Sequence, residues 1–326
     1  MNRRLLVWVR PGVVSCFLAL TLSATTARAQ ILNPPREATE GLELLYSGDP
    51  DAAIERFRSL QNRQPDHPLG YLLEDDARWW QILCESAEYK WGMVDAWHRE
   101  KPRKDTAFFE LADKVIALSE ARLKEEETAE MHFYAGMGYA FRARLLALRD
   151  ERRTTARAGV KAREHFLRSI ALDPNLADSY AGLGLYNYYV DTLSAMARVL
   201  RFFMGIPGGD KRVGMRQLER AMKEGELTRV EARFYLAKNL RNYDRDYERA
   251  AQVAEPLVAE YPQNPIFHLL LGDINAKLRR KEKAAASYGQ AAEIALRDPD
   301  CQRRIGQLAA AALAALGIHS PASTAP

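Results

Sequence analysis

The chain has 326 residues, with 47 Lys and Arg against 43 Asp and Glu, so its formal net charge is +4. Apolar residues make up 47% and charged residues 28%, which excludes an intrinsically disordered chain and a collagen-like fibre. The length allows one large domain, two ordinary domains or an array of repeats.

Residues 1–29 have the pattern of a secretory signal peptide. Two arginines precede an apolar stretch over 13–22, and Ala27 to Ala29 fit an A-x-A cleavage site. A lipoprotein anchor through Cys16 is the less favoured alternative, because the apolar region continues past that residue. Removal of this segment takes away four arginines that have no acidic partners, so the remaining chain is formally neutral. We therefore expect an exported protein, periplasmic or extracellular, without the basic surface that nucleic-acid binding requires.

Small residues, aromatic residues and prolines recur at fixed offsets along the rest of the chain. Ala250, Ala254 and Leu257 lie at offsets 0, 4 and 7, and Ala284, Tyr288 and Ala291 repeat these offsets 34 residues later. The same pattern is matched by Gly41, Ala53, Phe57 and Pro65, by Ala162, Phe166 and Pro174, and by Tyr180, Gly184, Gly272 and Pro262. Small side chains let two helices of a hairpin approach closely, aromatic rings fill the space between hairpins, and Pro ends a helix. This pattern resembles the tetratricopeptide repeat family.

The resemblance implies an all-α fold over residues 30–316, in which helical hairpins stack into a right-handed superhelical solenoid. The chain resembles exported bacterial members of that family. Repeats are recognisable at 34–67, 150–175, 177–226, 231–264 and 265–298. The interval 68–149 is irregular and predicts long helices near 69–95, 105–124 and 128–149. An insertion at 187–209 contains an apolar helix around 193–203, a helix from 300 to 316 caps the array, and 317–326 is predicted to be a disordered tail.

Two cysteines remain after the signal segment, Cys84 and Cys301. They lie near opposite ends of the expected elongated array, so we expect buried free thiols and no disulfide between them.

No pattern in the sequence points to catalysis. The six histidines form no HExxH or HxH motif, and the chain has no CxxC pair and no Gly-rich phosphate loop of the P-loop type. The adjacent carboxylates Asp75 and Asp76, like the run at 125–127, are expected to be solvated surface. The turn at 205–210 is expected to end with Asp210 as the N-cap of the next helix. We therefore expect no enzyme activity, no cofactor and no metal site.

Members of the family bind partners on the concave wall formed by the first helix of each hairpin. To find the wall positions, we align the repeats so that Gly184, Lys238 and Gly272 share one repeat position. The wall positions are then Tyr188, Tyr189, Tyr235, Asn239, Asn242, Tyr243, Asp273 and Lys277. Tyr offers rigid contact area with a polar tip, and Asn pairs with peptide backbone. Only Asn239 fits the dicarboxylate clamp of chaperone-binding members, which argues against a chaperone tail as ligand. The resemblance therefore implies an exported non-catalytic scaffold that binds a protein or peptide partner in its groove.

The alternative is a solenoid that binds an apolar ligand or a membrane surface. It would use the inserted helix at 190–206 together with the tryptophans Trp79, Trp80, Trp91 and Trp97, and Phe202 and Phe203 would be the apolar contacts. We favour a helix that packs over the array, because a free apolar helix promotes aggregation. Tryptophans at helical spacing are more often core residues than ligand contacts.

Overall fold

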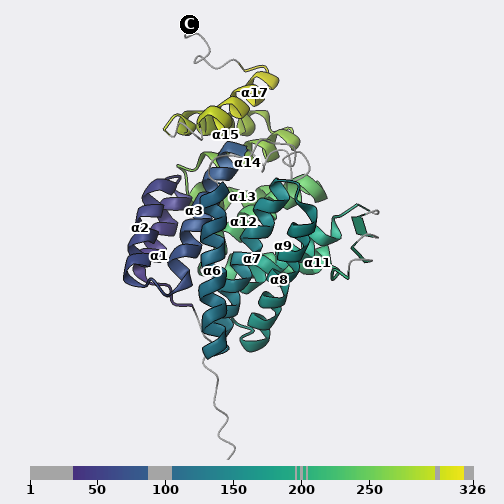
Figure 1. Cartoon of the computed structure of the whole chain (residues 1–326). Helices are drawn as coiled ribbons and strands as arrows, with labels where there is room; N and C mark the ends of the chain where they lie inside the picture. Colours follow the sequence, from purple (N-terminus) through teal and green to yellow (C-terminus); the bar gives the residue numbers. More distant parts are fainter. Residues whose placement is uncertain are drawn as a thin grey trace, which may run out of the picture.

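A computed structural model describes residues 32–86, 105–194, 197–198, 201–202, 205–297 and 302–318. Every regular element in these ranges is helical (Figure 1). The helices are α1 (Arg36–Tyr46), α2 (Pro50–Arg63), α3 (Pro68–Ser86), α6 (Asp105–Glu125), α7 (Ala129–Leu148), α8 (Arg152–Leu172), α9 (Ser179–Asp191), α11 (Lys211–Glu224), α12 (Arg229–Asn239), α13 (Tyr247–Glu260), α14 (Pro265–Lys277), α15 (Lys281–Ala295) and α17 (Gln307–Ala315), with short π-helices η1 (Leu240–Asp244) and η2 (Gln302–Gly306). The predicted signal peptide with Cys16, and Trp91, Trp97, Phe203 and Cys301, lie outside the described residues.

Consecutive helices pack against each other as hairpins, and the hairpins stack side by side (Figure 1). The packing confirms the role expected for the small residues. A Cβ placed on Gly41 would lie 2.2 Å from the ring of Phe57, and one on Gly272 would lie 2.7 Å from the ring of Tyr288. Both pairs are 16 residues apart. The aromatic ring of the second helix therefore sits directly against the backbone of the first, which only Gly allows.

The hairpin of α7 and α8 follows the same rule with longer helices. A Cβ on Gly136 would lie 2.8 Å from the ring of Phe166, but these two residues are 30 positions apart. The helices have 20 and 21 residues, whereas α1 and α2 have 11 and 14. The 34-residue period is lost here because the helices are longer, and the packing contact is kept.

The helix ends follow ordinary capping chemistry. Asp210 accepts hydrogen bonds from the backbone N–H groups of Arg212 (2.8 Å) and Val213 (3.0 Å), which confirms its predicted role as the N-cap of α11. At the C-terminal end, η2 and α17 pack on α15 and bury Ile305 and Ala309, as expected for a capping helix.

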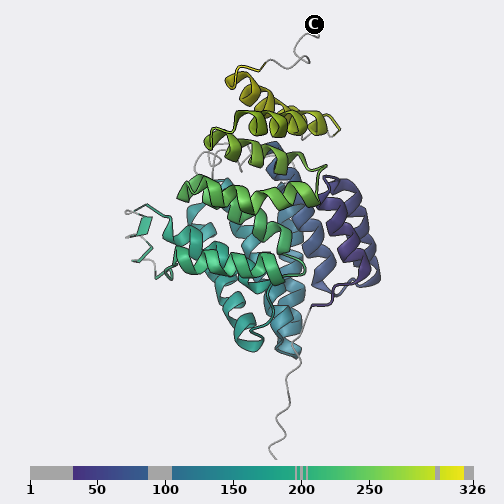
Figure 2. The same ribbon diagram turned by 180° about the vertical axis from the view of Figure 1, so that it is seen from behind.

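The array is not an open stack, because its N-terminal helices fold back onto the C-terminal hairpins (Figures 1 and 2). The ring of Trp80 in α3 lies 5.0 Å from that of Phe234 in α12 and 5.6 Å from that of Phe267 in α14. Beside them, the Asn264 side chain donates a hydrogen bond to the backbone carbonyl of Tyr46 (3.0 Å). One continuous core therefore runs from α1 to α17, and the expectation of an elongated array is wrong.

This closure also corrects the expectation for the cysteines. Cys84, near the end of α3, is buried and takes part in a disulfide. Its partner lies outside the described residues. The element η2, which begins at Gln302, contacts α3, so the two segments that were expected at opposite ends of the molecule are neighbours.

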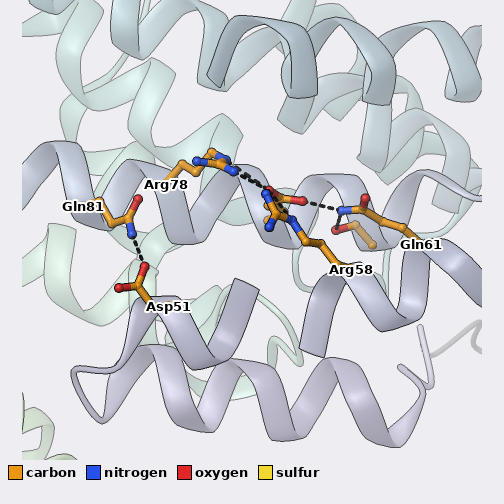
Figure 3. A network of polar contacts seen from close by, with 7 residues as sticks. Asp51, Arg58, Gln61, Arg78 and Gln81 are labelled. Carbon is orange, nitrogen blue, oxygen red and sulfur yellow. Dashed lines mark hydrogen bonds and ion pairs between the residues drawn. The ribbon is translucent and has the colours of Figure 1, made fainter. Parts of the chain in front are cut away.

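A polar seam joins α3 to α2 (Figure 3). Glu74 is 3% exposed and accepts hydrogen bonds from Gln61 (2.8 Å) and Arg78 (2.6 Å), with Arg58 Nε at 3.2 Å. Burial raises the pKa of Glu74, but these donors together hold it below its usual value. The carboxylate is therefore charged and satisfied, and it fixes α3 against the N-terminal hairpin.

The insertion after α9 projects from the side of the array next to α11 (Figure 1). Its far end returns close to the helix it left, because a Cβ on Gly209 would lie 2.4 Å from the carbonyl oxygen of Asn187. Tyr186 donates a hydrogen bond to the carbonyl of Pro207 (2.8 Å). We expected the inserted helix to pack over the array. Phe202 is 78% exposed, so at this residue it does not.

Candidate functional site

The eight predicted wall residues differ in how deeply the structure places them. Tyr188, Tyr235, Asn239 and Asp273 are buried, whereas Tyr189, Asn242 and Tyr243 are half-buried and Lys277 is exposed. Only the last four present much surface to a partner in this conformation. Partner binding by the wall remains a prediction, and the structure adds that half of its members face other parts of the same chain.

Three of the predicted tyrosines form one aromatic cluster. The ring of Tyr243 lies 5.9 Å from that of Tyr188 and 6.1 Å from that of Tyr189, and the latter two rings are 5.9 Å apart in edge-to-face geometry. The hydroxyl of Tyr189 donates a hydrogen bond to the side-chain oxygen of Asn239 (3.0 Å). Four of the predicted residues, from α9, α12 and η1, are thus brought together. The π-helix η1 places Tyr243 over this cluster, and such local departures from α geometry are frequent at functional sites.

A charged pair supports the cluster from below. The Tyr188 hydroxyl donates hydrogen bonds to the carbonyl of Asn239 (3.2 Å) and to the carboxylate of Asp244, which also pairs with Lys211 at the start of α11. Burial and the bond to Asp244 raise the pKa of Tyr188 well above its usual value. The phenol of Tyr188 is therefore neutral and acts as a hydrogen-bond donor, and these bonds hold its ring against that of Tyr243.

Asp273 and Lys277 lie apart from this cluster, on α14. Asp273 accepts hydrogen bonds from Tyr288 (2.7 Å) and from Arg241 (3.0 Å), and it is 5% exposed. It therefore ties η1 to the last hairpin, a structural role that the sequence pattern did not predict.

Tyr235 faces the interior, where α3 fills the concave side of the array. Its hydroxyl accepts a hydrogen bond from the indole N–H of Trp79 (2.9 Å). The guanidinium of Arg144 lies 4.9 Å from the Tyr235 ring centroid and 5.0 Å from that of Trp79. It also forms an ion pair with Glu231 (2.6 Å). Burial disfavours the charge of Arg144, but the Glu231 carboxylate raises the pKa of Arg144 above its usual value.

Two further carboxylates lie beside this ion pair. Asp75 is fully buried and Asp76 is 5% exposed, so the expectation that they form solvated surface is wrong. Burial raises the pKa of both well above the usual range, for Asp75 with help from the charge of Asp76 and for Asp76 with help from that of Glu231. Sequence reasoning missed this cluster because two adjacent acids in a helix usually face water. The signal that marks it is their position four residues, about one helical turn, before Trp79 and Trp80, which anchor α3 in the groove.

The described residues contain no group of three or more His, Cys, Asp or Glu side chains arranged to bind a metal ion. Over the same ranges, no helix combines the length and the apolar character that a membrane crossing requires. Trp79 and Trp80 contact the core described above rather than an empty space, so these two are core residues, as favoured.

The hairpins, the Gly–aromatic contacts between their helices and the terminal capping helix define an all-α repeat array. Residues 239–299 match the family model for the tetratricopeptide repeat. This segment is therefore similar to the tetratricopeptide repeat, and it carries five of the eight wall positions.

Solved structures similar to the chain include that of yeast Tom70, with 12% sequence identity and a TM-score of 0.37. The match covers 85% of this chain and 72% of that one. A likeness of this degree carries no argument about function. No curated protein matches the chain.

Proposed function

We propose that the protein is an exported, non-catalytic scaffold that binds a protein or peptide partner along the accessible part of its concave wall. The observation that carries this proposal is the half-buried pair Tyr189 and Tyr243, whose ring centroids lie 6.1 Å apart. Tyr243 and the half-buried Asn242 belong to the segment that matches the repeat family. Lys277 lies exposed on the same wall, one hairpin further on. Tyrosine and amide side chains of this kind give a partner rigid contact area and hydrogen bonds to its backbone.

The wall is held rigid by the contacts beneath it. Tyr188, Asn239 and Asp244 position the two half-buried tyrosines, so little side-chain freedom is lost when a partner docks. The deeper part of the groove is occupied by α3, and a partner on this wall would therefore lie across its rim and need not enter it.

Export is supported by the signal-like residues 1–29 and by the disulfide at Cys84. Disulfides persist in oxidising compartments such as the periplasm and the extracellular space.

The test is capture of partners from the exported fraction by the tagged protein, followed by a binding measurement with the partner identified. Truncating two aromatic contacts, Tyr189→Ala with Tyr243→Ala, should weaken binding by about 10-fold or more, as expected for central aromatic residues. The matched control is Tyr247→Ala, a half-buried tyrosine on α13 outside the wall. Equal affinities for the wild type and the double variant would contradict the assignment of the wall.

A further inference from the structure

The face of the array that carries the insertion is basic, although the chain as a whole is nearly neutral. Residues 151–224 include 13 basic and eight acidic residues. Within the ranges that the structure describes, several exposed arginines of this part form no ion pair: Arg153, Arg157, Arg198, Arg212 and Arg216. Net neutrality therefore results from a separation of charge and not from an even mixture.

Two arginines of this face converge on one tyrosine. Arg163 of α8 lies with its guanidinium 5.7 Å from the ring centroid of Tyr186. Arg201 of the insertion lies near the same tyrosine, because the hydroxyl of Tyr186 donates a hydrogen bond to the carbonyl of Pro207 (2.8 Å), the residue after Ile206. The charges of both arginines oppose the rise that burial causes in the pKa of Tyr186. Arg201 also donates a hydrogen bond to the carbonyl of Ile206 (3.4 Å). The two guanidinium groups thus meet beside the loop that closes the insertion.

Neither arginine has a carboxylate partner among the described residues, and the Nε atom of each is buried without a hydrogen-bond partner there. Like charges near one another repel, and a buried N–H without an acceptor is unfavourable. An anion with several oxygen atoms would relieve both effects. Phosphate fits best, because the planar guanidinium group matches the spacing of its oxygens.

Phe202 shows where that phosphate would come from. This residue follows Arg201 and is 78% exposed, the largest value among the large apolar side chains of the described residues, ahead of Leu296 at 60%. An aromatic side chain beside unpaired arginines is the arrangement of a membrane-interface site, where the ring enters the acyl boundary and the arginines bind lipid phosphates. A soluble phosphate would use the arginines and leave the exposure of Phe202 unexplained.

We propose that Arg163, Arg201 and Phe202 form a docking surface for a membrane that contains anionic phospholipid. The exposed arginines of α8 and α11 add long-range attraction to the lipid headgroups. The concave wall with Tyr189 and Tyr243 belongs to different elements, so this surface does not depend on the proposed scaffold function.

Flotation with vesicles tests this surface. The purified protein should float with vesicles of phosphatidylcholine mixed with phosphatidylglycerol and remain in the soluble fraction with phosphatidylcholine alone. Each arginine near an anionic surface contributes roughly fivefold in partitioning, so Arg163→Gln with Arg201→Gln should lower binding by about 30-fold. Phe202→Ser should lower it by about 10-fold or more, because the ring no longer leaves water.

A charge-matched control distinguishes binding by this surface from a general attraction between a basic protein and anionic vesicles. The double variant Arg56→Gln with Arg279→Gln removes the same charge from exposed positions on α2 and after α14, and it should bind as the wild type does. Equal loss in this control would overturn the proposal, and so would equal binding to both kinds of vesicle. If the protein bound glycerol phosphate at millimolar concentration but floated with neither kind of vesicle, the arginines would be assigned to a soluble phosphate. That result would also overturn the proposal. Circular dichroism of each variant confirms that the helices are intact.

Discussion

Replacing Arg144 with methionine removes a buried positive charge that pairs with Glu231 inside the closed array. Its side chain is 14% exposed and that of its partner Glu231 is 6% exposed, with 2.6 Å between Nη1 and Oε1. Asp75 and Asp76 lie close enough for their charges to act on the same guanidinium. After the substitution, Glu231 has lost its ion-pair partner, and Asp75 and Asp76 have lost a nearby positive charge.

Breaking a buried ion pair by removing one partner costs about 3–5 kcal/mol, because the other charge stays buried and unpaired. For a domain whose total stability is about 5–15 kcal/mol, this is a large fraction. The matched control is Arg142→Met, on the same helix. Arg142 pairs with Asp113, whose side chain is 58% exposed, so the control should lose at most about 1 kcal/mol.

The assay is urea unfolding followed by circular dichroism, with both variants compared with the wild type. Arg144→Met should have a clearly lower transition midpoint, and Arg142→Met should be nearly unchanged. If both variants lost the same amount, or if Arg144→Met lost less than about 1 kcal/mol, the ion pair would not hold the array closed.

Gly272→Ala places a methyl group 2.7 Å from the Tyr288 ring and should lower the unfolding free energy by about 1–3 kcal/mol. Gly289→Ala adds a methyl group where there is open space and should be neutral or slightly stabilising, so similar losses for both variants would contradict the packing role. Burial raises the folded-state pKa of Asp75 and Asp76 above the value of 3.8, so their contribution to stability is complete below that pH and is lost as pH rises through the raised pKa. The stability of Asp75→Asn relative to wild type should therefore increase as the pH rises above 3.8, and a constant difference would refute the burial argument. Digestion without reduction should recover Cys84 in a disulfide-linked peptide, and Cys84→Ser should lower stability by about 2–5 kcal/mol; an alkylatable Cys84 in the unreduced wild type would contradict the disulfide.

The hairpins could be predicted wherever the 16-residue spacing between Gly and its aromatic partner is kept. Gly41 with Phe57 and Gly272 with Tyr288 are such pairs, and the structure places each ring against the glycine. The spacing fails at Gly136 and Phe166, because α7 and α8 are longer than ordinary repeat helices. A search by period misses this hairpin, and a search by contact type with variable helix length would find it.

The closure of the array could not be predicted, because it depends on contacts between residues far apart in sequence. Trp79 contacts Tyr235 at a separation of 156 residues, and Asn264 reaches Tyr46 at a separation of 218. A repeat pattern describes only neighbouring hairpins, so it says nothing about what fills the concave side. For the same reason, the pattern places the wall positions along the chain but cannot predict that α3 buries Tyr235.

Small-angle X-ray scattering of the protein in solution tests the closed array most directly. A chain of residues 30–318 that folds into one compact body should have a radius of gyration of about 19 Å. This is the value the closed array predicts, since α3 packs between α12 and α14 and a single core runs through the molecule. A radius roughly a third larger or more, as an extended stack of hairpins gives, would contradict it.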